Sequence, residues 1–144
     1  MQSDSLPRED DYSLDQQVGF ILRRVTQRHL SIFAAHIPDL TPMQFAVLAK
    51  LRESGPLSQN ALGRATAMDA ATIKGVVDRL RQRDLVEARP GTVDQRRLFL
   101  DLTDAGRAMY QDRVSHARAI TQETLSPLSA SERRALLALL GRMT

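Results

Sequence analysis

Arginines crowd the middle of this chain, and their side chains are suited to bind phosphate groups and base edges. Six of them fall between positions 79 and 97: Arg79, Arg81, Arg83, Arg89, Arg96 and Arg97. Lys50 and Lys74 are the only lysines. A guanidinium offers a planar fork of donors that matches phosphate and guanine bidentately. Because acidic residues are interspersed among these arginines, a solvated surface of mixed charge remains the alternative.

Arg96 has the most specific setting of the six, because it follows Asp94 by two positions in a turn-rich segment. We expect the Asp94 carboxylate to hold the Arg96 guanidinium outward, with Arg97 beside it. An arginine presented in this way fits a narrow minor groove, where the negative potential of DNA is strongest.

A second group of candidate residues is small rather than charged. Apolar residues recur with the period of one buried helix face from Ile73 to Leu80, and Asp69 is placed to cap that helix. The opposite face carries the residues that we predict to contact DNA: Ala70, Ala71, Thr72, Lys74, Gly75 and Arg79. Small side chains let a helix approach base edges, and Thr72 and Lys74 can bond bases or phosphates. Gly75 costs about 1 kcal/mol inside a helix, which fits either a close approach to DNA or a crossing with a neighbouring helix.

Composition excludes several other functions. The chain has no cysteine, so disulfides, thiolate metal sites and cysteine nucleophiles are absent. Its three histidines show no spacing typical of a zinc site or triad, and neither an HExxH run nor a Gly-rich phosphate loop is present. We therefore expect no enzyme, no metal and no cofactor. No apolar run approaches the roughly 18 residues of a membrane span, and the N-terminus lacks the pattern of a signal peptide, which predicts a cytoplasmic protein.

Charge is distributed unevenly along the 144 residues. Residues 1–15 carry one arginine and five acids, a net charge of −4. Because the whole chain has a net charge of +3, the rest of the chain carries +7. We predict a flexible acidic N-terminal arm over residues 1–12 and a single domain over residues 13–144, which is long enough to bury one core.

Helix signals follow one another along the first half of that domain. Apolar residues keep a helical period from Leu14 to Ile37, which predicts one long helix ended by Pro38. Thr41 and Gln44 predict a capping box at the start of a second helix, and Ser58 the start of a third. The helix capped by Asp69 is then the fourth.

A β-hairpin and two further helices complete the predicted fold. Alternating runs from Leu85 to Arg89 and from Leu98 to Leu102 predict the two strands, with Phe99 and Asp101 on the face opposite the leucines. Thr103 caps a long helix, and Ser129 caps a last one. We predict a mainly α fold with a small β-hairpin wing: a winged helix-turn-helix with six helices.

The outer helices carry more apolar surface than a lone helical domain needs. These residues lie near both ends of the domain: Leu14, Val18, Ile21, Val25, Leu136, Leu137, Leu139 and Leu140. Such surface indicates a partner, and we expect an intertwined homodimer.

The hairpin and its exit also carry a recognisable motif. It consists of Asp94, Arg96, Leu100, Leu102, Thr103 and Gly106 within the run DQRRLFLDLTDAG. With the upstream runs VVDRLRQRDLVEA (76–88) and LTPMQFAVLAKL (40–51), the chain resembles the MarR family of bacterial transcription regulators from about Leu14 to Met143. The resemblance implies a triangular homodimer in which residues 13–37 and 104–144 form the dimerisation helices. The winged helix-turn-helix of each subunit, residues 41–103, would then face one half-site of a pseudo-palindromic operator in double-stranded DNA.

Members of the family commonly bind small aromatic compounds between the dimerisation helices and the DNA-binding lobe. The candidates for this site here are Arg28, His29, Phe33, His36, Phe45, Met109, Tyr110 and Arg113. We expect His29, His36 and Arg28 to hold a carboxylate while Phe33 and Phe45 flank a ring. The alternative is that Phe33 and Phe45 are core residues and that His29 is a hydrogen-bonded histidine of an interface. The run RRVTQRHLSIFAAHI (23–37) is similar to MarR-type regulators of aromatic-acid catabolism, which favours an aromatic carboxylate or its coenzyme A thioester as effector.

The implied function is a ligand-responsive repressor. An effector changes DNA affinity only by binding one lobe spacing better than another, so a ligand near His29 and Phe33 would fix a spacing that mismatches successive major grooves. The alternative function is a winged-helix module for protein contacts, without sequence-specific DNA binding. Salt separates the two, because DNA binding weakens steeply as salt is added.

Overall fold

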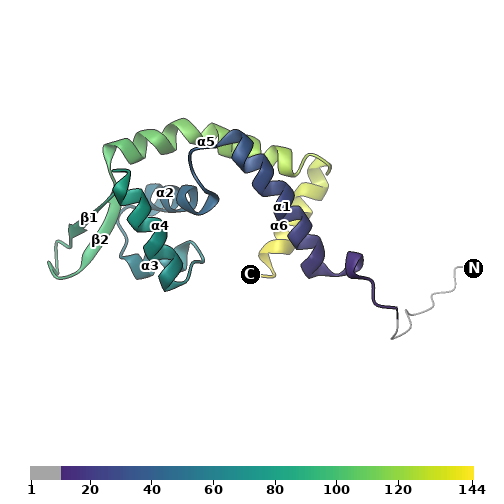
Figure 1. The fold of residues 1–144 in the computed structure, drawn as a ribbon, viewed down its shortest axis with the longest axis horizontal. Coiled ribbons are helices and arrows are strands. Elements are labelled where there is room, and N and C mark those ends of the chain that lie inside the picture. The colour runs from purple at the N-terminus through teal and green to yellow at the C-terminus, as the bar shows by residue number, and fades with distance from the viewer. Residues whose placement is uncertain (1–10) are drawn as a thin grey trace, which may run out of the picture.

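The computed structural model describes residues 11–144, which form six α-helices, a short 3-10 helix and one antiparallel β-hairpin (Figure 1). The mainly helical fold with a hairpin wing is therefore confirmed. Most of the predicted acidic arm lies outside the described residues. Among residues 11–144 no helix combines the length and the hydropathy needed to cross a membrane.

The first helical segment is broken, so the prediction of one continuous helix from Leu14 to Ile37 was wrong. A 3-10 helix, η1 (Leu14–Gln16), precedes α1 (Val18–His36). Gln17 between them is extended, with φ −85° and ψ 135°, and its side chain donates to the Ser13 carbonyl at 2.9 Å. The apolar period did not reveal the break because it continues across it.

Three helices build the lobe that follows: α2 (Pro42–Ser54), α3 (Gln59–Ala65) and α4 (Ala70–Gln82). The predicted capping box of α2 is confirmed, since Thr41 Oγ1 accepts from the Gln44 backbone N–H and Gln44 Oε1 accepts from that of Thr41, both at 3.1 Å. Asp69 caps α4 by accepting from the Thr72 N–H at 2.7 Å. Side-chain caps therefore set where these helices begin.

The wing is the hairpin of β1 (Val86–Pro90) and β2 (Leu98–Leu102), with Val86 opposite Leu102 and Pro90 opposite Leu98. It leads directly into α5 (Asp104–Thr124). Gly106 in the first turn of α5 is required by a close approach, because a Cβ there would lie 2.0 Å from the Leu85 carbonyl oxygen. The start of α5 is thus fixed against the start of β1.

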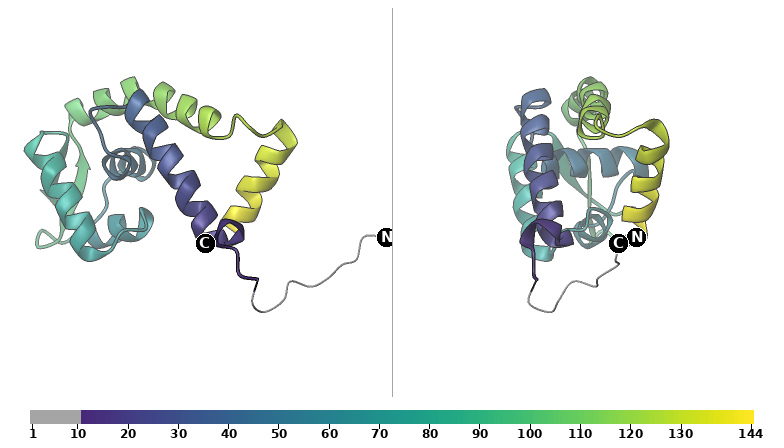
Figure 2. Two further views of the ribbon diagram at one scale, coloured as in Figure 1. Left: turned by 45° about the vertical axis from the view of Figure 1, so that its right-hand side comes forward. Right: turned by 90° about the vertical axis from the view of Figure 1, so that its right-hand side faces the viewer.

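The buried core lies within the lobe and reaches α1 and α5 at one side. Leu48, Leu62, Ile73, Leu80 and Leu102 are all at most 2% exposed. By contrast, α6 (Ala130–Gly141) has no buried residue. Figure 2 shows α6 turning back from the far end of α5, with α1 between it and the lobe.

Candidate DNA interface and effector site

The outer face of α4 is open to solvent at the positions predicted to contact DNA. Ala70, Ala71, Lys74, Gly75 and Arg79 are exposed and Thr72 is half-buried, while the apolar face from Ile73 to Leu80 is buried in the lobe. A Cβ built at Gly75 meets nothing within 4 Å. The structure therefore gives no support to a helix crossing as the reason for this glycine.

Charge on α4 changes from its start to its end. The Thr72 N–H bond to the Asp69 carboxylate holds the pKa of Asp69 below its ordinary value. In the middle of the helix, Lys74 Nζ pairs with Asp78 Oδ2 at 2.8 Å, four residues on. Arg79 forms no ion pair with any residue between 11 and 144, so its guanidinium remains available to a phosphate.

The tip of the wing is shaped by Asp94, though not as predicted. Asp94 Oδ1 accepts from the backbone N–H of Arg96 at 3.0 Å, and the Asp94 carbonyl accepts from the Arg97 N–H at 3.1 Å. The expectation that Asp94 holds the Arg96 guanidinium was wrong, because an aspartate two residues upstream reaches the main chain first and closes a turn. Arg96 and Arg97 are exposed, and within the described part of the chain neither forms an ion pair.

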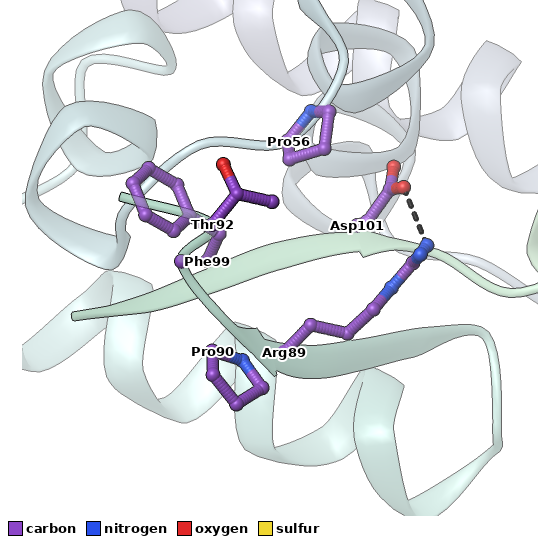
Figure 3. Close-up of a pocket in the computed structure, with 7 residues that line it drawn as sticks. Pro56, Arg89, Pro90, Thr92, Phe99 and Asp101 are labelled. Atoms are coloured by element: carbon purple, nitrogen blue, oxygen red, sulfur yellow. Dashed lines mark hydrogen bonds and ion pairs between the residues drawn. The ribbon is translucent and has the colours of Figure 1, made fainter. Parts of the chain in front are cut away.

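The base of the wing contains a buried acid on the strand face that was predicted to lie opposite the leucines. Asp101 is 7% exposed, and its Oδ2 pairs with Arg89 at 2.7 Å and with Arg107 at 3.4 Å. Figure 3 shows the Arg89 contact beside a cavity of about 340 Å³ that Pro56 and Phe99 also line. Strand alternation alone did not indicate this burial, because it depends on Arg107 in the helix that follows and on Pro56 in a loop far from Asp101 in the sequence.

The predicted aromatic residues of the effector site do lie together. The rings of Phe33 on α1 and Phe45 on α2 meet edge to face, with centroids 6.4 Å apart, and Phe45 stacks on Tyr110 of α5 at 5.8 Å. Met109 packs against the same core. Phe33 is buried, whereas Phe45 and Tyr110 are half-buried, so the cluster joins the core to the surface between α1, α2 and α5.

Three residues that were predicted to hold a carboxylate gather at the C-terminal end of α5. Arg28 donates to the carbonyls of Thr124 at 2.7 Å and Glu123 at 2.9 Å, where carbonyls at a helix end carry partial negative charge. His29 Nδ1 lies 2.8 Å from Thr124 Oγ1, and His36 Nε2 lies 2.6 Å from Glu123 Oε2. The structure therefore brings Arg28, His29 and His36 to one place. Glu123, which the sequence analysis did not single out, already supplies a carboxylate there.

Arg113, the last predicted ligand residue, is engaged elsewhere. Its Nε and Nη2 donate to the two carboxylate oxygens of Asp39 at 3.2 and 2.6 Å, and Asp112 contacts the same guanidinium. This bidentate pair lowers the pKa of Asp39 and raises that of Arg113. Asp39, in the loop between α1 and α2, was also missed from the sequence.

An apolar surface runs along the outer helices. Its members are exposed leucines, valines and isoleucines of η1, α1 and α6: Leu14, Val18, Ile21, Leu22, Val25, Leu137 and Leu139. Nothing in the described chain covers them. In residues 11–144 no group of three or more His, Asp or Glu side chains is arranged to hold a metal ion.

These features define a class of protein. A helix pair whose second member exposes a small-residue face, followed by a hairpin with arginines at its tip, is a winged helix-turn-helix DNA-binding domain. Residues 39–97 match the model of the MarR family. The chain belongs to this family of non-enzymatic, DNA-binding transcriptional regulators, as its sequence motifs predicted.

Comparison with individual proteins agrees with this assignment. The chain is 42% identical over 134 residues to the HTH-type transcriptional repressor NicR of Pseudomonas putida, covering 92% of this chain and 85% of NicR. A probable transcriptional regulator from Pseudomonas aeruginosa superposes with a TM-score of 0.89 at 49% identity, covering 92% of this chain and all of that one. BpsR of Bordetella bronchiseptica superposes with a TM-score of 0.88 at 42% identity, covering 92% and 96%. That BpsR structure concerns regulation of DNA binding by 6-hydroxynicotinic acid.

Proposed function

We propose that this chain is a repressor that binds a pseudo-palindromic operator as a homodimer and is released by a small aromatic acid. In this proposal α4 enters the major groove and Arg96 the flanking minor groove of each half-site. The observation that carries it is the open face of α4 at Gly75, together with the exposed Arg96 and Arg97 at the wing tip, which form no ion pair within residues 11–144.

The homodimer rests on the exposed apolar surface of η1, α1 and α6. Val18 is 63% exposed and Leu137 is 56% exposed, so both side chains leave apolar area in contact with water. A second copy of the chain that packs against these helices would bury this apolar area. Burial stabilises a dimer by about 25 cal/mol for each Å² of apolar surface removed from water. Two-fold symmetry then places one α4 in each half-site of the operator.

The effector site rests on the arrangement between α1, α2 and α5. Phe45 and Tyr110 offer half-buried ring faces, and His29, His36 and Arg28 supply donors for a carboxylate. The similarity to BpsR makes a hydroxylated aromatic acid the first compound to test. A coenzyme A thioester of such an acid is the second form of ligand.

A binding assay with a selected duplex tests the proposal. The parent protein is used to enrich a 30-base-pair duplex from a random pool, and its affinity for that duplex is measured at increasing salt. We expect an inverted-repeat sequence and a steep fall in affinity with salt. Enrichment of no sequence would contradict DNA recognition and favour a protein-contact module. Adding 6-hydroxynicotinic acid, its coenzyme A thioester or benzoate to the complex then identifies the ligand class, and a compound that binds without releasing DNA counts against the release mechanism.

A further inference from the structure

The base of the wing combines four charged side chains from three elements. Arg89 of β1 contacts Asp101 of β2 at 2.7 Å and Glu87 of its own strand at 2.9 Å. Arg107 of α5 contacts the same Asp101 oxygen at 3.4 Å. These two acids and two arginines balance in charge, and the Asp101 side chain at their centre is only 10% exposed. Asp104 adds a longer contact to Arg107, at 3.5 Å, from a fully exposed side chain.

The strand register places two acidic residues opposite each other, and Arg89 compensates their charges. Glu87 lies directly opposite Asp101 in the hairpin, and two like charges across a strand pair destabilise it. Arg89 bonds both carboxylates and so neutralises the pair. The hairpin therefore depends on these charges for its shape near α5, where no apolar cross-strand contact takes their place at this register position.

The second arginine connects the wing to the helix behind it. Thr103 Oγ1 donates to the Asp84 carbonyl at 2.6 Å and fixes the chain where β2 ends. The Asp101–Arg107 contact adds a link between the hairpin itself and the first turn of α5. We infer that Asp101 is a positioning residue: by holding Arg89 and Arg107 it sets the direction in which the wing presents Arg96 to DNA. This inference rests on the proposed function.

Geometry makes the direction of the wing important. Arg96 lies in the turn that precedes β2, and β2 runs about 10 Å from Leu98 to Asp101, so a tilt of about 10° at the base moves the start of that turn by about 2 Å. The minor groove of B-DNA is only about 6 Å wide. A small change at Asp101 is thus enough to misplace the Arg96 side chain.

The test is a double-mutant cycle between Asp101→Asn and Arg96→Ala, measured with the full chain and one duplex enriched by the parent protein. Asp101→Asn removes a negative charge, so simple electrostatics predicts slightly tighter DNA binding. Positioning predicts the opposite sign, a loss of about tenfold. Because the loss acts through Arg96, it should largely vanish in the Arg96→Ala background.

Asp104→Asn is the matched control. Asp104 lies three residues after Asp101, its side chain is fully exposed and it pairs only weakly with Arg107, so the substitution removes the same charge without opening the buried group. We expect its affinity to equal or slightly exceed that of the parent. Circular dichroism checks that each variant folds. If Asp101→Asn does not fold, Arg107→Gln opens only the α5 side of the group and enters the same cycle.

Three results would overturn the inference. They are unchanged or tighter binding by Asp101→Asn, losses that add fully with Arg96→Ala, and an Arg96→Ala variant that binds as well as the parent. Failure of the parent itself to enrich any duplex would instead refute the proposed DNA-binding function, so the two failures are distinguishable.

Discussion

Arg113 donates two hydrogen bonds to the carboxylate of Asp39, from Nε to Oδ1 at 3.2 Å and from Nη2 to Oδ2 at 2.6 Å. The pair joins the loop between α1 and α2 to α5, where Arg113 lies about one turn after Tyr110 of the aromatic cluster. A ligand carboxylate aimed at Arg113 therefore has to displace Asp39. Glu123 occupies His36 in the same way, whereas Arg28 and His29 contact carbonyls and a hydroxyl and carry no carboxylate that an acid would have to displace.

The Asp39–Arg113 pair should make stability depend on pH. The hydrogen bonds and charge of Arg113 hold the pKa of Asp39 below its ordinary value of 3.8. The pair therefore stabilises the fold above that value, and the stabilisation is lost as pH falls through the lower pKa of the folded state. Because the Asp39 side chain is 38% exposed, we expect Asp39→Asn to cost at most about 1 kcal/mol at pH 7 and nothing below the folded pKa. Urea unfolding at several pH values measures this, and a cost that persists at the lowest pH would contradict it. Glu53→Gln, in an exposed pair with Lys50, is the control.

Arg96→Ala should weaken binding to the enriched duplex without affecting the fold. Arg96 is exposed at the wing tip, so its loss removes no core contact, while an arginine in a narrow minor groove contributes strongly to affinity. We expect at least about a tenfold loss, or about 1.4 kcal/mol, with an unchanged melting temperature. Arg118→Ala on α5 removes the same charge from an exposed site far along the helix. An equal loss in both variants would show that only net charge matters.

Gly75→Ala should separate stability from DNA binding. Among residues 11–144, no atom outside the backbone of α4 itself lies within 4 Å of a Cβ at this position, so alanine should stabilise the free protein by about 1 kcal/mol through its higher helix propensity. On DNA the added methyl group lies between the helix and the base edges, and we expect weaker binding. Thermal unfolding and a binding assay on the same samples measure the two effects. Tighter binding by Gly75→Ala would refute the close approach.

Capping residues and apolar periods predicted the helices and strands of the fold more completely than they predicted the contacts within the candidate sites. Thr41, Asp69 and Ser129 cap the helices they were expected to cap because a cap needs only residues within one turn. The exposure of Gly75 was also predictable locally, because the apolar period from Ile73 to Leu80 places it on the opposite face of the helix. The burial of Asp101 was missed because it depends on Arg107 and on cross-strand neighbours, and strand alternation carries no information about these. The contact of Glu123 with His36 spans 87 positions, and no local pattern indicates it.

Glu123 gives the sharpest test of the effector site. Its Oε2 lies 2.6 Å from His36 Nε2, the position where a ligand carboxylate is proposed to bind, so the protein carboxylate and the ligand compete for one donor. Glu123→Gln removes the competing charge and lessens repulsion of an anion. We expect 6-hydroxynicotinic acid to bind this variant severalfold more tightly in calorimetric titration, since one lost charge contact near a protein surface amounts to about 1 kcal/mol. Glu53→Gln serves again as the remote control. Weaker binding by Glu123→Gln would show instead that Glu123 accepts a hydrogen bond from the ligand, and equal binding would place the acid away from His36.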